Sequence, residues 1–114
     1  MSIEELTARI RSFRDARDWR QFHSPKDMAV AIIAEAGELL QHFVWKTPEQ
    51  SELRAVEKRD EIREEIADVG ILLFELADNI GVRLDEAMLD KLEKNERRYP
   101  AGKSRGSNAK YNEL

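Results

Sequence analysis

A chain of 114 residues with 37% charged residues, 7% aromatic residues and a formal net charge of −4 resembles one highly soluble helical domain more than a β-sandwich. It contains no cysteine, which excludes disulfides and thiolate metal sites. It has no apolar run of membrane-spanning length, its N-terminus is acidic and its net charge is negative, so we expect a cytoplasmic protein that binds neither membranes nor nucleic acid.

The first half of the chain predicts two helices. Apolar residues at spacings of three and four indicate an amphipathic helix from about residue 3 to 17. After a break, Ser24, Pro25 and Asp27 supply an N-cap, a proline in the first turn and an early acid. The second helix should therefore cover about residues 25–45.

A third helical region begins where Thr47 and Gln50 form a capping box around a proline. We expect it to continue, with a break near Ser51, until Asn79 and Gly81 supply a stop signal.

The last helix should begin after Asp85 as its N-cap, cover residues 86–98 and end at Pro100. We therefore predict an all-α bundle of four to five helices. One helical domain would span residues 1–100, and residues 101–114 would form a polar C-terminal tail, loose in the absence of a ligand.

Acid pairs three residues apart share a helix face and recur along this acid-rich chain, so their spacing alone carries little information. Only three pairs lie in apolar surroundings: Glu35/Glu38, Glu65/Asp68 and Glu75/Asp78. The last pair is close to a helix end, where it can reach water, and we assign it to the surface. The first two lie well inside helices that must pack on one another.

Four carboxylates brought together by two packed helices would need compensation for their charge. All-oxygen ligation favours Mg²⁺, with Mn²⁺ as a substitute. The alternative is that each acid pairs with a cation such as Arg63 or Lys58. A di-iron carboxylate site is disfavoured because it requires Glu-x-x-His motifs, and no EF-hand loop is present.

Aromatic residues are placed where a nucleotide base could stack. Trp45 follows Glu38 by seven residues, which in a continuous helix aligns the two side chains about 10 Å apart along the axis. Trp19, Phe22 and His23 lie in the break before the same helix. Stacking on such side chains contributes about 1–3 kcal/mol per base, although each tryptophan taken singly is better explained as a core residue.

Lys91, Asn95 and Arg98 form one polar stripe on the last predicted helix, with Tyr99 beside it. The stripe could contact phosphate oxygens, but taken alone it is better explained as a solvated helix face. No Gly-rich phosphate loop is present, so phosphate binding would depend on metal and side chains.

Several separate motifs occur in order: "RDWRQFHSPKD", "EAGELLQHFVWK", "EEIADV", "KLEKNERRYP" and "KYNEL". Together they resemble the MazG-like all-α nucleoside triphosphate pyrophosphohydrolases, and most of all the short dCTP pyrophosphatases. The resemblance covers the chain from about Arg17 to Leu114.

The resemblance implies roles for individual residues. Glu35, Glu38, Glu65 and Asp68 would bind Mg²⁺, and we take Glu35 or Glu38 as the general base. The base and sugar pocket would be lined by Trp19, Arg20, Gln21, Phe22, His23 and Trp45, and the triphosphate would contact Lys91, Asn95 and Tyr99. In relatives that prefer dCTP, a tyrosine occupies the pocket position of Leu72 and a histidine that of Ile10. Both departures bear on the base preference and leave the metal chemistry untouched.

The activity implied is Mg²⁺-dependent hydrolysis of a nucleoside or deoxynucleoside triphosphate to the monophosphate and pyrophosphate. The expected substrate is dCTP or a related or modified deoxynucleotide, the expected role is the removal of unwanted nucleotides, and a homo-oligomer (a dimer or tetramer) is implied. The alternative is a non-catalytic helical module that binds nucleotides or a protein partner.

Overall fold

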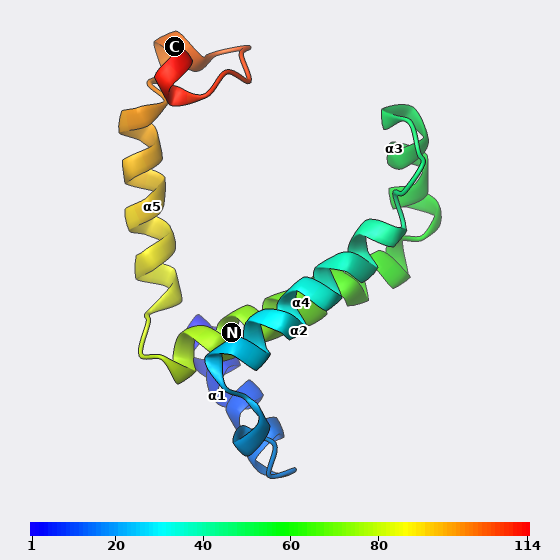
Figure 1. Cartoon of the computed structure of the whole chain (residues 1–114), viewed down its shortest axis with the longest axis vertical. Helices are drawn as coiled ribbons and strands as arrows, with labels where there is room; N and C mark the ends of the chain where they lie inside the picture. The colour runs from blue at the N-terminus through cyan, green and yellow to red at the C-terminus, as the bar shows by residue number, and fades with distance from the viewer. The chain divides into compact units, whose positions relative to one another are not determined.

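The computed structural model describes residues 1–114 and contains helices but no strands (Figure 1), so the predicted all-α class is confirmed. It has six α-helices and two 3₁₀ turns: α1 (Ile3–Asp15), η1 (Arg20–Phe22), α2 (Pro25–Gln41), α3 (Pro48–Glu57), α4 (Arg59–Asn79), α5 (Leu84–Arg98), α6 (Ala101–Ser104) and η2 (Tyr111–Glu113). The predicted count of four to five is exceeded by α6, a helix of 4 residues. No helix combines the length and the apolar character that crossing a membrane requires.

The chain divides into two compact units, Met1–Gly81 and Val82–Leu114. The first contains α1 to α4, and the second contains α5, α6 and η2. The segment that we predicted as a polar tail is therefore partly helical. The division into a domain over residues 1–100 and a tail over 101–114 stays a prediction.

The helix starts follow the capping signals of the sequence. The Ser24 hydroxyl accepts a hydrogen bond from the Asp27 backbone N–H at 3.1 Å at the start of α2. At the start of α3, Thr47 and Gln50 exchange side-chain to backbone hydrogen bonds of 2.9 and 3.1 Å, which completes the predicted capping box. Gly81, with φ of 74°, takes the left-handed conformation just after α4 ends. These starts and this stop are confirmed.

Two boundaries predicted in the first half of the chain are wrong. Helix α2 ends at Gln41 rather than near residue 45, because the chain turns there and Trp45 has a φ of 61°, which no right-handed helix accommodates. The break in the third helical region lies at Lys58 (φ −113°, ψ 30°) and not near Ser51. Ser51 lies within α3, where its backbone N–H donates to the Thr47 carbonyl at 2.8 Å and its hydroxyl donates to the Pro48 carbonyl at 2.7 Å.

The start of α5 also differs from the prediction. Its N-cap is Arg83 rather than Asp85. Asp85 lies in the first turn, where its carboxylate accepts a hydrogen bond from the Glu86 backbone N–H at 2.9 Å. An acid in this position still accepts a hydrogen bond from a helix N–H and interacts favourably with the positive end of the helix dipole. The prediction therefore identified the right residue but placed it at the N-cap instead of in the first turn.

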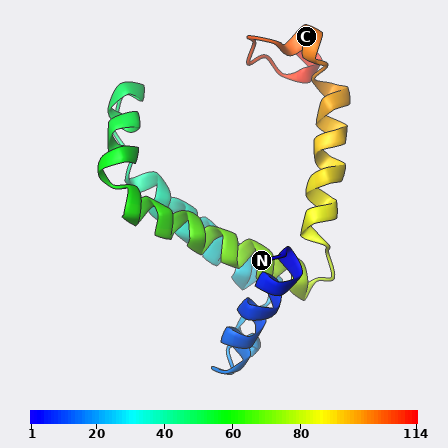
Figure 2. The same ribbon diagram turned by 180° about the vertical axis from the view of Figure 1, so that it is seen from behind.

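Helices α2 and α4 run side by side in opposite directions and form the main body of the first unit (Figures 1 and 2). Helices α1 and α3 also pack on α4. The buried apolar side chains of this body are few: Ile10, Met28, Ile62 and Ala77. The interior between α2 and α4 is thus small, and polar residues occupy part of it.

Large apolar side chains remain exposed on both long helices. On α2 they recur along one stripe at Val30, Ile33 and Leu40, and Ile33 is 72% exposed. On α4 they recur every seventh residue at Ile66 and Leu73, with Ile80 just past its end. Repeated apolar residues on one helix face normally pack against another surface. Each helix therefore presents an apolar surface in addition to the face buried between α2 and α4.

Candidate functional site

The two interior acid pairs face one another across α2 and α4. Burial raises the pKa of the Glu35 carboxyl above its ordinary value, and the charge of Glu38 and a hydrogen bond with Glu38 raise this pKa further. The charges of Asp68 and Glu65 on α4 act in the same direction. All four acids named from the sequence therefore lie close enough for their charges to interact.

Three of these acids, Glu35, Glu38 and Asp68, have no cationic partner. Oε2 of Glu35 is buried without a hydrogen-bond partner, and the buried Oε2 of Glu65 has only the His42 ring beside it. None of the four acids forms an ion pair with a lysine or arginine, so the alternative pairing with Arg63 or Lys58 is not realised. Buried polar atoms without a partner are uncommon because they lose hydration without replacement.

His42 is a member of this cluster to which the sequence analysis assigned no role. Its Nε2 lies 2.5 Å from Oε2 of Glu65, and both side chains are partly buried. Its Nδ1 is buried without a partner. His42 lies seven residues after Glu35 and thus on the same side of α2. That spacing is the signal by which it could have been found.

The donor set suits a hard divalent cation, although the side chains do not converge on one point. No three acids or histidines of the chain are arranged tightly enough to hold a metal ion as they stand. Glu35 is directed to Glu38, while Glu65 is directed to His42. The buried, unpartnered oxygen of Glu35 is nevertheless an atom that a cation would satisfy, and carboxylate oxygens are the ligands that Mg²⁺ prefers. The residues therefore fit such an ion, with Glu38, Glu65 and Asp68 completing the set.

The aromatic residues expected to receive a base are exposed. Trp19 packs edge-on against Phe13 with ring centroids 5.7 Å apart, and Phe22, the last residue of η1, is exposed. Trp45 is 97% exposed and borders a depression of about 290 Å³ at the start of α3. The predicted helical alignment of Trp45 with Glu38 is wrong, because α2 ends at Gln41. Neither tryptophan is a core residue of this chain.

Most of the remaining base-pocket residues lie in the segment between α1 and α2. The Gln21 side chain donates to Asp18, and the Arg20 guanidinium donates to the His23 carbonyl at 3.1 Å. The His23 ring contacts Glu75 on α4 at 2.6 Å. Glu75 is only 5% exposed, so its assignment to the surface is wrong. The apolar surroundings of Glu75 in the sequence were the signal of its burial.

The two positions that depart from the dCTP-preferring pattern are apolar in this chain. Leu72 is partly buried on α4, one turn after Asp68. Ile10 is buried on α1 and, with Phe13 and Ile71, lines an apolar groove of about 510 Å³. Neither residue offers a hydrogen-bonding group to a substrate.

The residues expected to contact a triphosphate lie in the second unit, on or just after α5. Lys91 is exposed, and the Asn95 carbonyl accepts a hydrogen bond from the Tyr99 backbone N–H at 2.7 Å. The Tyr99 ring meets Tyr111 edge-on at 6.1 Å, and the Arg98 guanidinium lies 4.7 Å from the Tyr111 ring centroid. These contacts order the end of the chain against the end of α5.

Comparison with known proteins gives consistent results. Residues 30–114 match the MazG-like family. The proteins named dCTP pyrophosphatase 1 from Bos taurus and Homo sapiens are each 38% identical to the chain over 115 residues, which span 99% of this chain and 68% of each relative. The crystal structure of a pyrophosphatase from Archaeoglobus fulgidus has a TM-score of 0.82 and 43% identity, and the match covers 85% of this chain and 91% of that chain.

Proposed function

This chain belongs to the MazG-like family, and we propose that it is a Mg²⁺-dependent enzyme that hydrolyses a nucleoside or deoxynucleoside triphosphate to the monophosphate and pyrophosphate. The observation that carries this proposal is the meeting of four acids between α2 and α4, with the pKa of Glu35 raised and a buried oxygen of Glu35 left unpartnered. Such a cluster destabilises the folded chain, because like charges repel in a partly buried site. A bound cation would offset that repulsion.

The acids would hold the cation through their carboxylate oxygens, among them the unpartnered oxygen of Glu35. When bound, Mg²⁺ would neutralise charge on the triphosphate and make the attacking water more acidic. Glu35 or Glu38 would accept the proton of that water as general base. The raised pKa of Glu35 makes its carboxylate a stronger base, and the greater exposure of Glu38 gives it access to water. His42 would steady Glu65 through their close contact.

We propose dCTP or a related or modified deoxynucleotide as the substrate, and the removal of unwanted nucleotides as the role. The relatives named dCTP pyrophosphatase 1 support this choice. The exposed rings of Trp19 and Trp45 are suited to stack on a base. Lys91, Asn95 and Tyr99 would contact the triphosphate.

Incubation of the purified protein with Mg²⁺ and a panel of deoxy- and ribonucleoside triphosphates should release pyrophosphate. We expect deoxycytidine triphosphates to give the highest kcat/KM, measured by coupled pyrophosphate detection. Orthophosphate in place of pyrophosphate would mean cleavage at the terminal phosphate and would contradict the mechanism. If nucleotides raised the Tm but no product formed, the chain would be a non-catalytic binding module.

We also propose that the chain forms a homo-oligomer through the apolar residues exposed on α2 and α4. Replacing Ile33 by aspartate should convert the oligomer to a monomer in sedimentation velocity, because a charge would have to be buried at the contact. Lys26→Asp, at an exposed polar position of the same helix, is the control and should leave the assembly intact. Wild-type protein that sediments as a monomer at all concentrations would refute the oligomer.

A further inference from the structure

Two oppositely charged residues outside the acid cluster are buried where α1 meets α4. Glu75 is 5% and Arg14 is 6% exposed. Removing a carboxylate from water destabilises the folded state unless the carboxylate is paired and hydrogen-bonded. Nothing in the roles proposed for the four metal-binding acids requires this pair, so its retention inside a small interior calls for an explanation.

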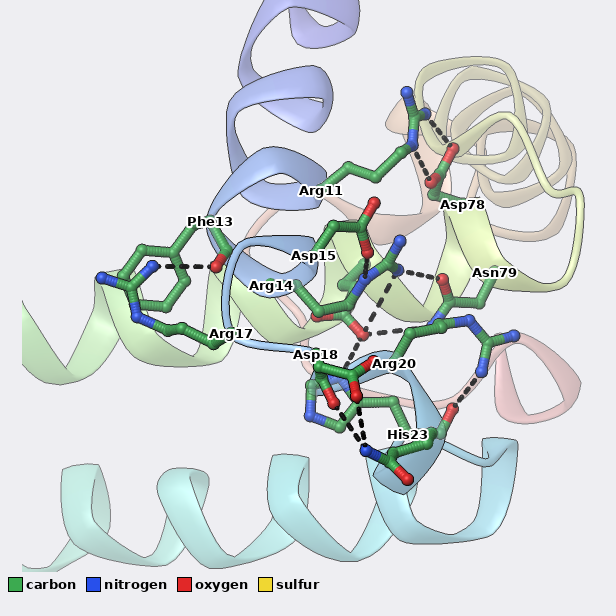
Figure 3. Close-up of polar contacts among 12 residues, drawn as sticks. Arg11, Phe13, Arg14, Asp15, Arg17, Asp18, Arg20, His23, Asp78 and Asn79 are labelled. Carbon is green, nitrogen blue, oxygen red and sulfur yellow. Dashed lines mark hydrogen bonds and ion pairs between the residues drawn. The ribbon is translucent and has the colours of Figure 1, made fainter.

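A single oxygen of Glu75 joins three elements of the fold. Oε2 of Glu75 lies 2.6 Å from Nδ1 of His23 and accepts a hydrogen bond from the Asn79 amide at 3.1 Å. The Arg14 guanidinium lies 3.8 Å from the same oxygen and donates to the Asn79 side-chain carbonyl at 2.8 Å. Figure 3 shows the hydrogen bond between Arg14 and Asn79 that forms part of this network. The network thus connects α1, α4 and the segment before α2.

The segment Trp19–His23, which carries the proposed base pocket, has few other attachments besides the edge-on contact of Trp19 with Phe13 of α1. Its backbone is bound to α1 by one hydrogen bond, from the Trp19 N–H to the Arg14 carbonyl at 3.2 Å. It follows Asp18, which has the left-handed φ of 55°. Its other polar contacts are local and exposed, such as that between Arg20 and the His23 carbonyl. The contact of His23 with Glu75 is therefore its buried polar attachment to α4.

The contact also determines which nitrogen of His23 is available. An ionised carboxylate can only accept hydrogen bonds, so Nδ1 of His23 carries the proton that lies toward Glu75. In the neutral ring, Nε2 is then an unprotonated acceptor on the opposite side of the imidazole. The ring is 23% exposed, so part of it can be reached from outside.

We propose that Glu75 is a positioning residue for substrate binding, which acts by holding His23, and with it the segment Trp19–His23, against α4. This inference rests on the proposed function, in which that segment receives the base and sugar of the nucleotide. Glu75 does not touch the substrate. It presents the His23 ring in one orientation with Nε2 available to a substrate donor, and Arg14 and Asn79 hold Glu75 in place.

The chain offers a matched control on the same two helices. Arg11 of α1 and Asp78 of α4 form two hydrogen bonds of 2.8 and 3.0 Å, and this pair has no contact with His23 (Figure 3). Asp78→Asn therefore weakens the contact between α1 and α4 without loosening the segment. Glu75→Gln keeps the side-chain shape but removes the charge that holds the imidazole.

Steady-state kinetics of wild type, Glu75→Gln, His23→Ala, the double variant and Asp78→Asn test the proposal. Glu75→Gln should raise KM about tenfold with kcat changed by less than about twofold, as expected for loss of a charge-assisted hydrogen bond used in binding. His23→Ala should do the same. In the His23→Ala background, Glu75→Gln should raise KM no further, because the two residues act as one unit. Asp78→Asn should leave KM unchanged.

Additive effects of Glu75→Gln and His23→Ala on KM, or an equal rise in Asp78→Asn, would overturn the positioning role while leaving the proposed activity standing. Absence of pyrophosphate release by the wild-type protein would refute both the positioning role and the proposed activity. One measurement does not depend on the variants folding: the imidazole ¹⁵N NMR spectrum of wild-type His23 should show the Nδ1–H tautomer in the neutral ring. The Nε2–H tautomer would also overturn the proposal.

Discussion

Replacing Glu38 by glutamine should abolish Mg²⁺-dependent pyrophosphate release and leave the helical fold unchanged. The amide has the shape of the carboxylate but lacks its charge, so it can neither complete the acid cluster nor accept a proton from water. Loss of a general base alone typically costs about 10²-fold or more. Coupled pyrophosphate detection measures the activity, and circular dichroism measures the fold.

The matched control for this variant is Glu64→Gln. Glu64 is exposed on α4 directly before Glu65 and lies outside the cluster, so removing its charge changes the net charge equally without changing the site. We expect Glu64→Gln to keep near wild-type activity. Full activity in Glu38→Gln, with an unchanged dichroism spectrum, would remove Glu38 from the mechanism. Equal losses in both variants would mean that net charge, and not the site, controls the rate.

Mg²⁺ should raise the Tm of the wild-type protein, and Glu35→Gln should raise the Tm of the metal-free protein while reducing the response to Mg²⁺. The four acids repel one another in the folded chain. The pKa of Glu35 is raised by burial and by this repulsion. Binding at about 100 times Kd contributes about 2.7 kcal/mol, which corresponds to roughly 10 °C or more in a domain of about 100 residues. Neutralising one acid relieves the repulsion and also removes a ligand.

The pH dependence of these Tm values follows from the direction of the Glu35 shift. Because the folded-state pKa of Glu35 is raised, the folded chain holds this proton more tightly than the unfolded chain. The contribution of Glu35 to stability therefore falls as pH rises through that pKa. The response to Mg²⁺ should change in the opposite sense and grow with pH, because metal binding requires ionised carboxylates.

Calorimetry of both proteins at mildly acidic and mildly alkaline pH, with Mg²⁺ or a chelator, measures these effects. If Mg²⁺ did not change the Tm of the wild-type protein at alkaline pH, a cation site between α2 and α4 would be contradicted. A metal-free Tm that falls in Glu35→Gln would show that Glu35 stabilises the fold, and the cluster would then need another explanation.

Much of the fold could be predicted because its determinants are local. The capping groups at Ser24 and Thr47 and the stop at Gly81 act within one helical turn, so residue type and spacing suffice to place these helix ends. The cluster could be predicted for a related reason. A helix fixes that Glu35 and Glu38 share a face, and the apolar neighbours of both residues show that this face packs against another helix.

The sequence by itself thus determined the helical class, most helix ends and the two interior acid pairs. Only the tertiary structure decided which polar residues meet across helices. Local pattern could indicate that His42 shares the face of Glu35 and that Glu75 lies among apolar residues. It could not reveal that His42 meets Glu65 or that Glu75 meets His23 and Arg14, because these partners are separated by 23 or more positions in the chain. Such contacts depend on how α1, α2 and α4 pack, and that packing is set by many side chains acting together.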